Sequence, residues 1–171
     1  RLYGADFTGA NLTFSSMNSA VLTGAIFTGA TLDRADLSTA QLAWTDFQGA
    51  SVQGAELGGA NLSWSNLDSA QLSYSNLGAD FSCANLSHAN LLGSQGFQSS
   101  GLGGQPGPLL YGATLSDGSI SKRLDSTCGR FDGLLANTDL STADGSNSDL
   151  SGIDRKSTRL NSSHLVISYA V

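Results

Sequence analysis

The repeating part of the sequence, residues 2–77, reads in groups of five LYGAD FTGAN LTFSS MNSAV LTGAI FTGAT LDRAD LSTAQ LAWTD FQGAS VQGAE LGGAN LSWSN LDSAQ LSYSN L. The first position of each group is Leu or Phe in 14 of 16 cases, and Met17 and Val52 fill the other two. The fourth position holds Ala, Ser or Thr throughout. A period of five fits neither a lone helix nor a lone strand. It predicts a chain that points two residues inward, turns a corner and repeats.

Such a fixed period is the signature of a solenoid. The motif Ala-(Asp/Asn)-Leu-x-x, seen as ANLTF at residues 10–14 and ADLST at residues 35–39, resembles the pentapeptide repeat family. That resemblance implies an all-β fold, a right-handed quadrilateral β-helix with one pentapeptide on each side and four per coil. The length of the regular frame in this sequence then predicts about four to five regular coils, followed by an irregular C-terminal part.

A coil of four pentapeptides makes its own prediction, because residues 20 positions apart should then stack. Trp44 and Trp64 match at an outward position, whereas a triangular coil of 15 residues would place Trp44 over Gly59. The inward positions also match at this spacing. The predicted core includes Phe7, Phe27, Phe47, Leu67, Leu42 and Leu62.

Two breaks interrupt the period, and we expect both at corners, where a bulge or loop absorbs them. One residue is lost near residues 78–81, and one is gained near residues 93–97. We therefore predict a β-helix over residues 1–102. Residues 103–153 are predicted to form a loop rich in Gly and Pro, followed by degenerate repeats in which the period returns faintly at residues such as Leu110, Leu115 and Ile120.

The last segment, residues 154–171, reads DRKSTRLNSSHLVISYAV and departs abruptly from the repeat. It resembles the translation of a sequencing adapter along its whole length. We interpret it as an artefact that is disordered or non-native, and we leave it out of the functional argument. The chain begins in mid-repeat as well, so the sequence is predicted to be a fragment at both ends.

The chain is acidic, with a formal net charge of −6. The final segment contributes three basic residues and one acid, so residues 1–153 carry −8. This balance argues against direct nucleic-acid binding, which needs clustered Lys and Arg. The sequence has no catalytic motif, cofactor motif or membrane-spanning apolar run, so we expect a protein that is not an enzyme and has no cofactor or metal. The few cysteines and the lack of a visible leader favour the cytoplasm, although a targeting peptide ahead of Arg1 stays open.

Four aromatic residues occupy one outward position of the repeat, two residues after the large inward one: Phe14, Trp44, Trp64 and Tyr74. Each is followed by Ser or Thr, whereas every other small inward position up to residue 75 is Ala. This coincidence indicates a coupled corner geometry. The stacked tryptophans would anchor a partner or, alternatively, only cover the rod wall.

Acidic residues also recur at the coil spacing. Asp36 and Glu56 should stack, either to share a cation or, as we favour, to form a solvated acidic face. The predicted partner-binding residues are therefore Trp44, Trp64, Tyr74, Asp36 and Glu56.

Three functions are compatible with a rigid solenoid of this kind. The absence of site chemistry favours a non-enzymatic protein-interaction or scaffold module with an unknown protein partner. The alternative implied by the resemblance is an acidic DNA mimic that binds a basic groove like that of DNA gyrase, with dimerisation through a C-terminal element. A surface that binds ice would need a continuous Thr ladder, but the column of Thr8 and Thr28 continues with Gln48 and Asp68.

Overall fold

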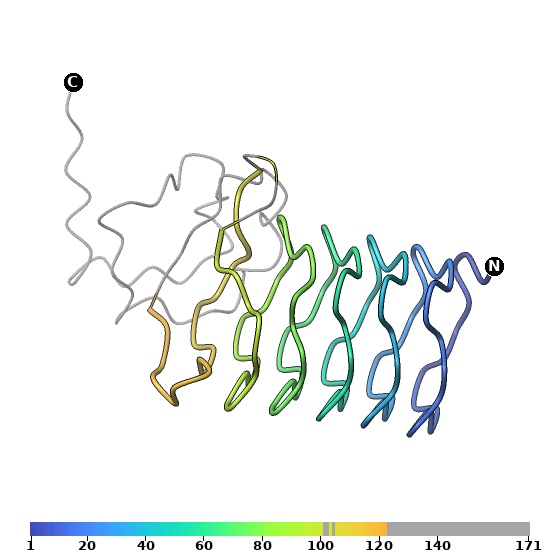
Figure 1. Cartoon of the computed structure of the whole chain (residues 1–171), viewed down its shortest axis with the longest axis horizontal. Helices are drawn as coiled ribbons and strands as arrows, with labels where there is room; N and C mark the ends of the chain where they lie inside the picture. Colours follow the sequence, from blue (N-terminus) through green and yellow to red (C-terminus); the bar gives the residue numbers. More distant parts are fainter. Residues whose placement is uncertain (101–102, 104, 123–171) are drawn as a thin grey trace, which may run out of the picture.

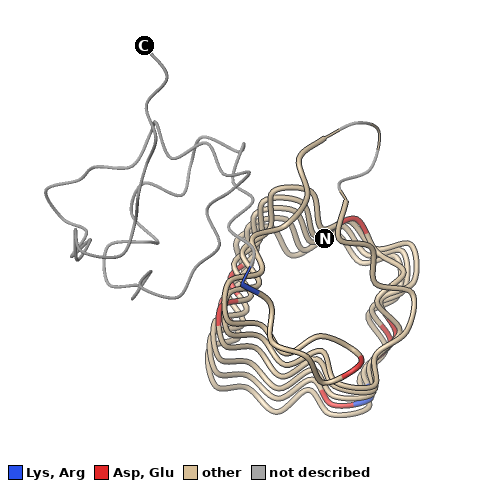
Figure 2. Ribbon diagram, turned by 90° about the vertical axis from the view of Figure 1, so that its left-hand side faces the viewer, with Lys and Arg blue, Asp and Glu red and all other residues tan. Residues whose placement is uncertain are grey.

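The computed structural model describes residues 1–100, 103 and 105–122, which form a rod of stacked coils (Figure 1). The described residues contain no α-helix, and their regular structure consists of single-residue β-bridges rather than longer strands. The parallel bridges run from Asp6↔Ile26 to Asn90↔Thr114. Viewed along the rod, successive coils lie in register around one interior (Figure 2).

Backbone hydrogen bonds hold each coil between its two neighbours. Phe27 donates its N–H to the carbonyl of Asp46 (2.6 Å), and Ile26 donates to the carbonyl of Ala5 (2.9 Å). Asp6 bridges Ile26, which in turn bridges Asp46, so residues 20 positions apart form continuous columns. A solenoid of this kind is stable only as a stack, because each coil covers the ends of the next.

Each side of a coil ends in a four-residue turn. The Ala10 N–H donates to the Phe7 carbonyl (2.9 Å), and Gly9, the third residue of this turn, has φ +65°. A positive φ at that position alone is the mark of a type II turn, which glycine enters without steric cost. Positive φ recurs at residues 4, 9, 14 and 19, so the coil turns four corners in every 20 residues.

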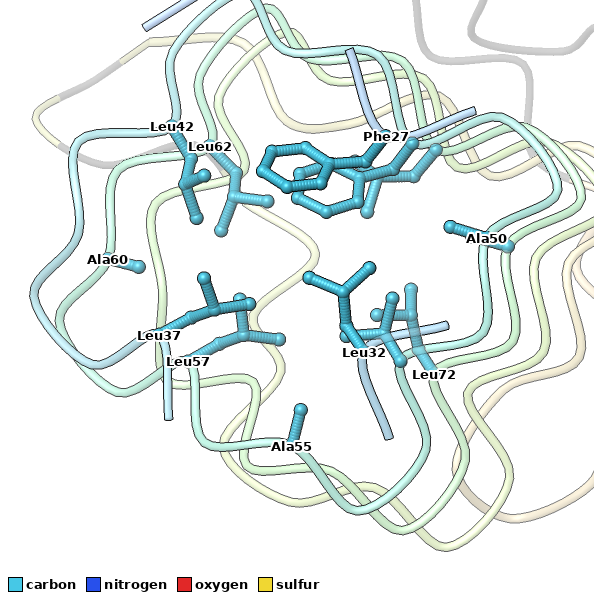
Figure 3. Close-up of a cluster of buried hydrophobic side chains, with 14 of the residues drawn as sticks. Phe27, Leu32, Leu37, Leu42, Ala50, Ala55, Leu57, Ala60, Leu62 and Leu72 are labelled. Carbon is cyan, nitrogen blue, oxygen red and sulfur yellow. The ribbon is translucent and has the colours of Figure 1, made fainter. Parts of the chain in front are cut away.

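The core is a column of inward-facing side chains. Leu and Phe from the first position of each pentapeptide and Ala from the fourth point into the same interior (Figure 3). Phe27 is fully buried between Phe7 and Phe47, with ring centroids 5.0 Å and 4.7 Å away and planes within 8°. Leu42, Leu62 and Leu67 are buried too. Phe7 is only partly buried, because it lies in the first coil and has a ring neighbour on one side.

The first break in the period is absorbed at a corner. The Ala79 N–H donates to the Leu77 carbonyl (2.7 Å), so a three-residue turn around Gly78 replaces the usual four-residue turn. The bridges then join residues 19 apart, as in Asn66↔Asn85, but the same columns continue. One residue is thus lost without disturbing the inward pattern.

The second break opens into a loop. Gly96 adds a residue with φ +73°, and Phe97 packs against the core with its ring 5.6 Å from that of Phe81. The chain then leaves the coil and returns where Pro106 accepts a hydrogen bond from the Cys83 N–H (3.1 Å). Leu109 resumes the bridges.

The end of the described chain differs from the expected continuation. Leu110 and Ala113 are buried, and Leu115 packs against the core, as further repeats would. Ile120, however, is exposed and pairs antiparallel with Thr114. The chain reverses here because a turn closed by the Gly118 N–H and the Leu115 carbonyl (2.9 Å) sends it back along its own edge. The faint period at Ile120 therefore does not place its side chain in the core. The remaining predicted repeats, Cys128 and residues 154–171 lie outside the described residues.

Candidate functional site

The four outward aromatic residues of the repeat sit at corners in an unfavourable backbone conformation. Phe14, Trp44, Trp64 and Tyr74 have φ between 59° and 63°. For residues other than glycine this left-handed region costs roughly 1–2 kcal/mol. Glycine fills the same position in many other corners, including Gly24 and Gly49. Bulky residues held in a costly conformation on the surface are a reason to look for function there.

One column of corners, which we call the Trp corner, contains Gly4, Gly24, Trp44, Trp64 and Cys83 in successive coils. The rings of Trp44 and Trp64 stack with centroids 5.1 Å apart and planes within 5°. Trp44 remains 47% exposed. The prediction that this pair stacks is confirmed, and the pair forms a flat aromatic surface on one edge of the rod.

The hydroxyl residues that follow the tryptophans reinforce their turns. Thr45 and Ser65 are buried, and each donates its hydroxyl to the first carbonyl of its own turn, on Leu42 and Leu62, at 2.6 Å. With alanine in this position, the carbonyl of Leu42 or Leu62 would accept only the backbone N–H that closes the turn. The coupling of aromatic and hydroxyl residues noted in the sequence thus has a physical basis at both tryptophans.

The other two members of the set behave differently. Ser75 donates to the Val52 carbonyl in the preceding coil (2.7 Å) and accepts from the Ala55 N–H (3.2 Å). Ser15 Oγ is buried with no hydrogen-bond partner. The hydroxyl therefore reinforces its own aromatic turn only at the two tryptophans, Ser75 instead joins the turn of residues 52–55 in the preceding coil, and the structure offers no account of Ser15.

A second column, the Tyr corner, contains Phe14, Arg34, Gly54, Tyr74 and Gly93. Phe14 and Tyr74 are 68% and 70% exposed. The Arg34 guanidinium carbon lies 5.5 Å from the centre of the Phe14 ring. The Tyr74 ring lies over Gly93, where an added Cβ would be 2.6 Å from Tyr74 Cε1. This corner stands half a coil from the Trp corner, on the opposite edge of the rod.

The predicted acidic column is present. Asp36 bridges Glu56, which bridges Asn76, on the side that follows the Tyr corner. Ser38 donates its hydroxyl (2.6 Å) and its backbone N–H (3.0 Å) to Asp36, and these bonds lower the pKa of Asp36 below its ordinary value. Glu56 accepts from the Asn76 amide (3.0 Å). The two carboxylates are held by neighbouring side chains and backbone.

The predicted binding residues therefore do not form one site. Trp44 and Trp64 lie on one edge, and Tyr74, Asp36 and Glu56 gather near the opposite edge. The sequence prediction did not include Phe14 and Arg34, which line the same edge as Tyr74. Their 20-residue spacing was the signal that would have placed them in that column.

Two further residues are held by their neighbours. His88 Nδ1 lies 3.1 Å from the Asp68 carboxylate, and its ring meets the Tyr111 ring edge-on at 5.9 Å. Cys83, which occupies an outward position of the repeat, is 4% exposed because the chain returns beside it at Pro106. Its sulfur takes part in a disulfide.

Acidic side chains are spread around the coil rather than gathered on one side (Figure 2). Asp6 and Asp46 belong to one column, with Ile26 between them, and Asp36 and Glu56 belong to the column on the opposite side. No group of three potential metal-binding side chains occurs in the described part of the chain. Nor does any helix within residues 1–100, 103 and 105–122 have the length and apolarity to cross a membrane.

Comparison with known proteins identifies the repeat. The family described as pentapeptide repeats matches in 8 copies, over residues 1–38 and 45–78. A pentapeptide repeat protein from the Arabidopsis thaliana thylakoid lumen has 30% sequence identity and a TM-score of 0.52. The match covers 53% of this chain and 64% of that protein. This likeness implies a right-handed quadrilateral β-helix.

Cyanobacterial structures are also similar. A pentapeptide repeat protein from Cyanothece 51142 is 34% identical over 54% of this chain and 56% of its own, with a TM-score of 0.42. HetL from Nostoc, a protein involved in heterocyst differentiation regulation, is 32% identical over 69% of this chain and 65% of its own, with a TM-score of 0.38. The chain thus spans less than two thirds of the length of these three relatives. No curated protein matches the sequence.

Proposed function

Because the chain belongs, over residues 1–38 and 45–78, to the pentapeptide repeat family, we propose that it is a non-enzymatic protein-interaction module. The observation that supports this is the Trp44–Trp64 stack at the Trp corner, in which Trp44 is exposed and Trp64 is half-buried. Tryptophan is among the residues most enriched at binding hot spots. A partner protein is expected to pack an apolar or aromatic side chain against this surface.

Two physical arguments favour binding over a purely structural role. The left-handed conformation costs roughly 1–2 kcal/mol at each tryptophan, whereas aromatic stacking returns about 0.5–1.5 kcal/mol. The pair therefore contributes little net stability to the rod. The stack also sits on a backbone fixed by coil-to-coil hydrogen bonds, so binding loses little conformational entropy.

The acidic DNA-mimic alternative draws no support from the described surface. Duplex DNA carries one negative charge per about 1.7 Å of its axis, and a mimic needs a comparably dense row. Asp6 and Asp46 lie on the opposite side of the coil from Asp36 and Glu56, and an isoleucine separates the first two. The proposal is therefore a protein partner bound at an aromatic edge.

The test replaces both tryptophans by glycine, Trp44→Gly and Trp64→Gly. Glycine suits the positive φ, so the melting temperature should hold or rise while capture of partners from an extract of the source falls. Thr39→Gly with Ser69→Gly is the matched control, because both residues have positive φ at corners without aromatics. Undiminished capture by the tryptophan variant, or a loss of stability above about 2 kcal/mol, would reject the aromatic anchor.

A further inference from the structure

We infer that the disulfide of Cys83 closes within this chain, onto Cys128, and that the protein therefore acts in an oxidising compartment. The chain has two cysteines, Cys83 and Cys128, and the sulfur of Cys83 takes part in a disulfide. Cys128 is thus the one partner that the same chain can supply. The inference concerns covalent structure and location, and it stands apart from the proposed interaction function.

A cysteine of another molecule is the alternative partner, and the surroundings of Cys83 argue against it. Cys83 is buried, its Sγ lies 4.0 Å from the Pro106 carbonyl oxygen, and its N–H donates to that same oxygen (3.1 Å). Directly after it, the Ala84 carbonyl accepts from the Leu109 N–H (2.9 Å). A foreign chain would have to displace residues 106–109 to reach this sulfur. A cysteine of the same chain can bond before that segment packs.

Formation of the bond is an oxidation that removes two electrons and two protons from the two thiols. The thiolate of one cysteine attacks the disulfide of an oxidant, either a small-molecule disulfide or a disulfide oxidoreductase, and a mixed disulfide forms. The second thiolate then attacks the cysteine sulfur of that mixed disulfide. The oxidant leaves with both of its sulfurs as thiols, so the reaction needs a compartment that supplies such a disulfide.

The compartment follows from where disulfides persist. They form and last in secreted, periplasmic and endoplasmic-reticulum proteins, whereas cytoplasmic thiol systems keep cysteines reduced. The burial of Cys83 adds to this persistence, because a reducing thiolate must reach the sulfur that it attacks. The small number of cysteines favoured the cytoplasm in the sequence, but the pairing of the only two favours an oxidising compartment.

The bond also has a defined place on the rod. Cys83 follows Trp64 in the Trp corner, and the Trp64 N–H donates to the carbonyl of Ser82 (2.9 Å), the residue before Cys83. From Cys83 to Cys128 the bond closes a loop of about 45 residues. A cross-link over a loop of this length restricts the unfolded chain and so stabilises the folded one. Reduction is therefore expected to lower stability.

Mass spectrometry of the full chain tests the connection. The chain is secreted into an oxidising bacterial periplasm, treated with iodoacetamide without reductant, and digested with trypsin. Trypsin separates the two cysteines, because it cuts after Arg34, Lys122, Arg123 and Arg130. We expect no alkylated cysteine, and one species that joins peptides 35–122 and 124–130 and comes apart on reduction. Alkylated Cys83, or a link from Cys83 to another molecule, would overturn the inference.

Thermal unfolding tests whether the bond is structural. Dithiothreitol should lower the melting temperature of the wild-type chain by roughly 5–15 °C. Cys128→Ser should melt with the reduced wild type and should not respond to dithiothreitol. Thr127→Ser is the matched control, because it changes the neighbouring residue, keeps both sulfurs and should respond as the wild type does. Equal melting temperatures for the oxidised and reduced wild type would contradict a structural disulfide.

The thiol state of the native protein tests the compartment. Cells of the source are quenched in acid, which protonates thiolates and stops exchange, and the protein is then denatured, alkylated and captured with an antibody. We expect Cys83 and Cys128 to be unalkylated until reductant is added. Alkylation of both cysteines before reduction would show that the native protein resides in a reducing compartment and would overturn the inferred location.

Discussion

The substitution Phe27→Ala tests the central packing argument of this fold. Phe27 is fully buried, and rings stack on both of its faces at 5.0 Å and 4.7 Å. Replacing a buried Phe by Ala usually costs about 3–5 kcal/mol. The upper half of that range is expected here, because backbone hydrogen bonds fix the coil spacing and prevent the cavity from collapsing. We predict a loss of about 4–5 kcal/mol in the free energy of unfolding.

Urea denaturation followed by circular dichroism measures this loss, and Phe7→Ala is the matched control. Phe7 belongs to the same column but is partly buried and has one ring neighbour, so its removal should cost only about 1–2 kcal/mol. The reasoning is refuted if Phe27→Ala costs less than about 1 kcal/mol, or if the two variants lose the same amount.

Two further predictions concern corners. Gly96→Ala places a Cβ 3.0 Å from the backbone nitrogen of Gly78 at a residue with positive φ, so it should lower the free energy of unfolding in urea by about 2–3 kcal/mol. Gly24→Ala is the control, because Gly24 also has positive φ but has open space around it, and this variant should lose only about 1 kcal/mol. Equal losses in the two variants would contradict the steric argument. Ser65→Ala removes a buried hydroxyl bonded at 2.6 Å and should lower the melting temperature by the equivalent of about 1 kcal/mol. Ser15→Ala removes an unpaired one and should be neutral or stabilising, so a comparable loss in both would disprove the role of the bond.

Much of the candidate site was visible in the repeat. The spacing of Trp44 and Trp64 predicted their stack, since side chains at equivalent positions of successive coils must face the same way. The same rule predicted the Asp36–Glu56 column. It did not show that Tyr74 belongs with that column rather than with the tryptophans. That separation follows from counting corners around the coil, which the predicted set of binding residues did not take into account.

The sequence alone determined the repeat of five, the identity of the inward residues and the stacking of positions 20 apart. Each of these features depends on a residue pattern that occurs in every coil. Other features became visible only in the tertiary structure. The Tyr74 ring lies over Gly93 of the next coil, whereas the three-residue turn at Gly78 and the reversal that pairs Ile120 with Thr114 are local departures from the repeated turn. A repeating pattern specifies what each coil shares, but an interrupted corner or an end is set by the space that its neighbours leave.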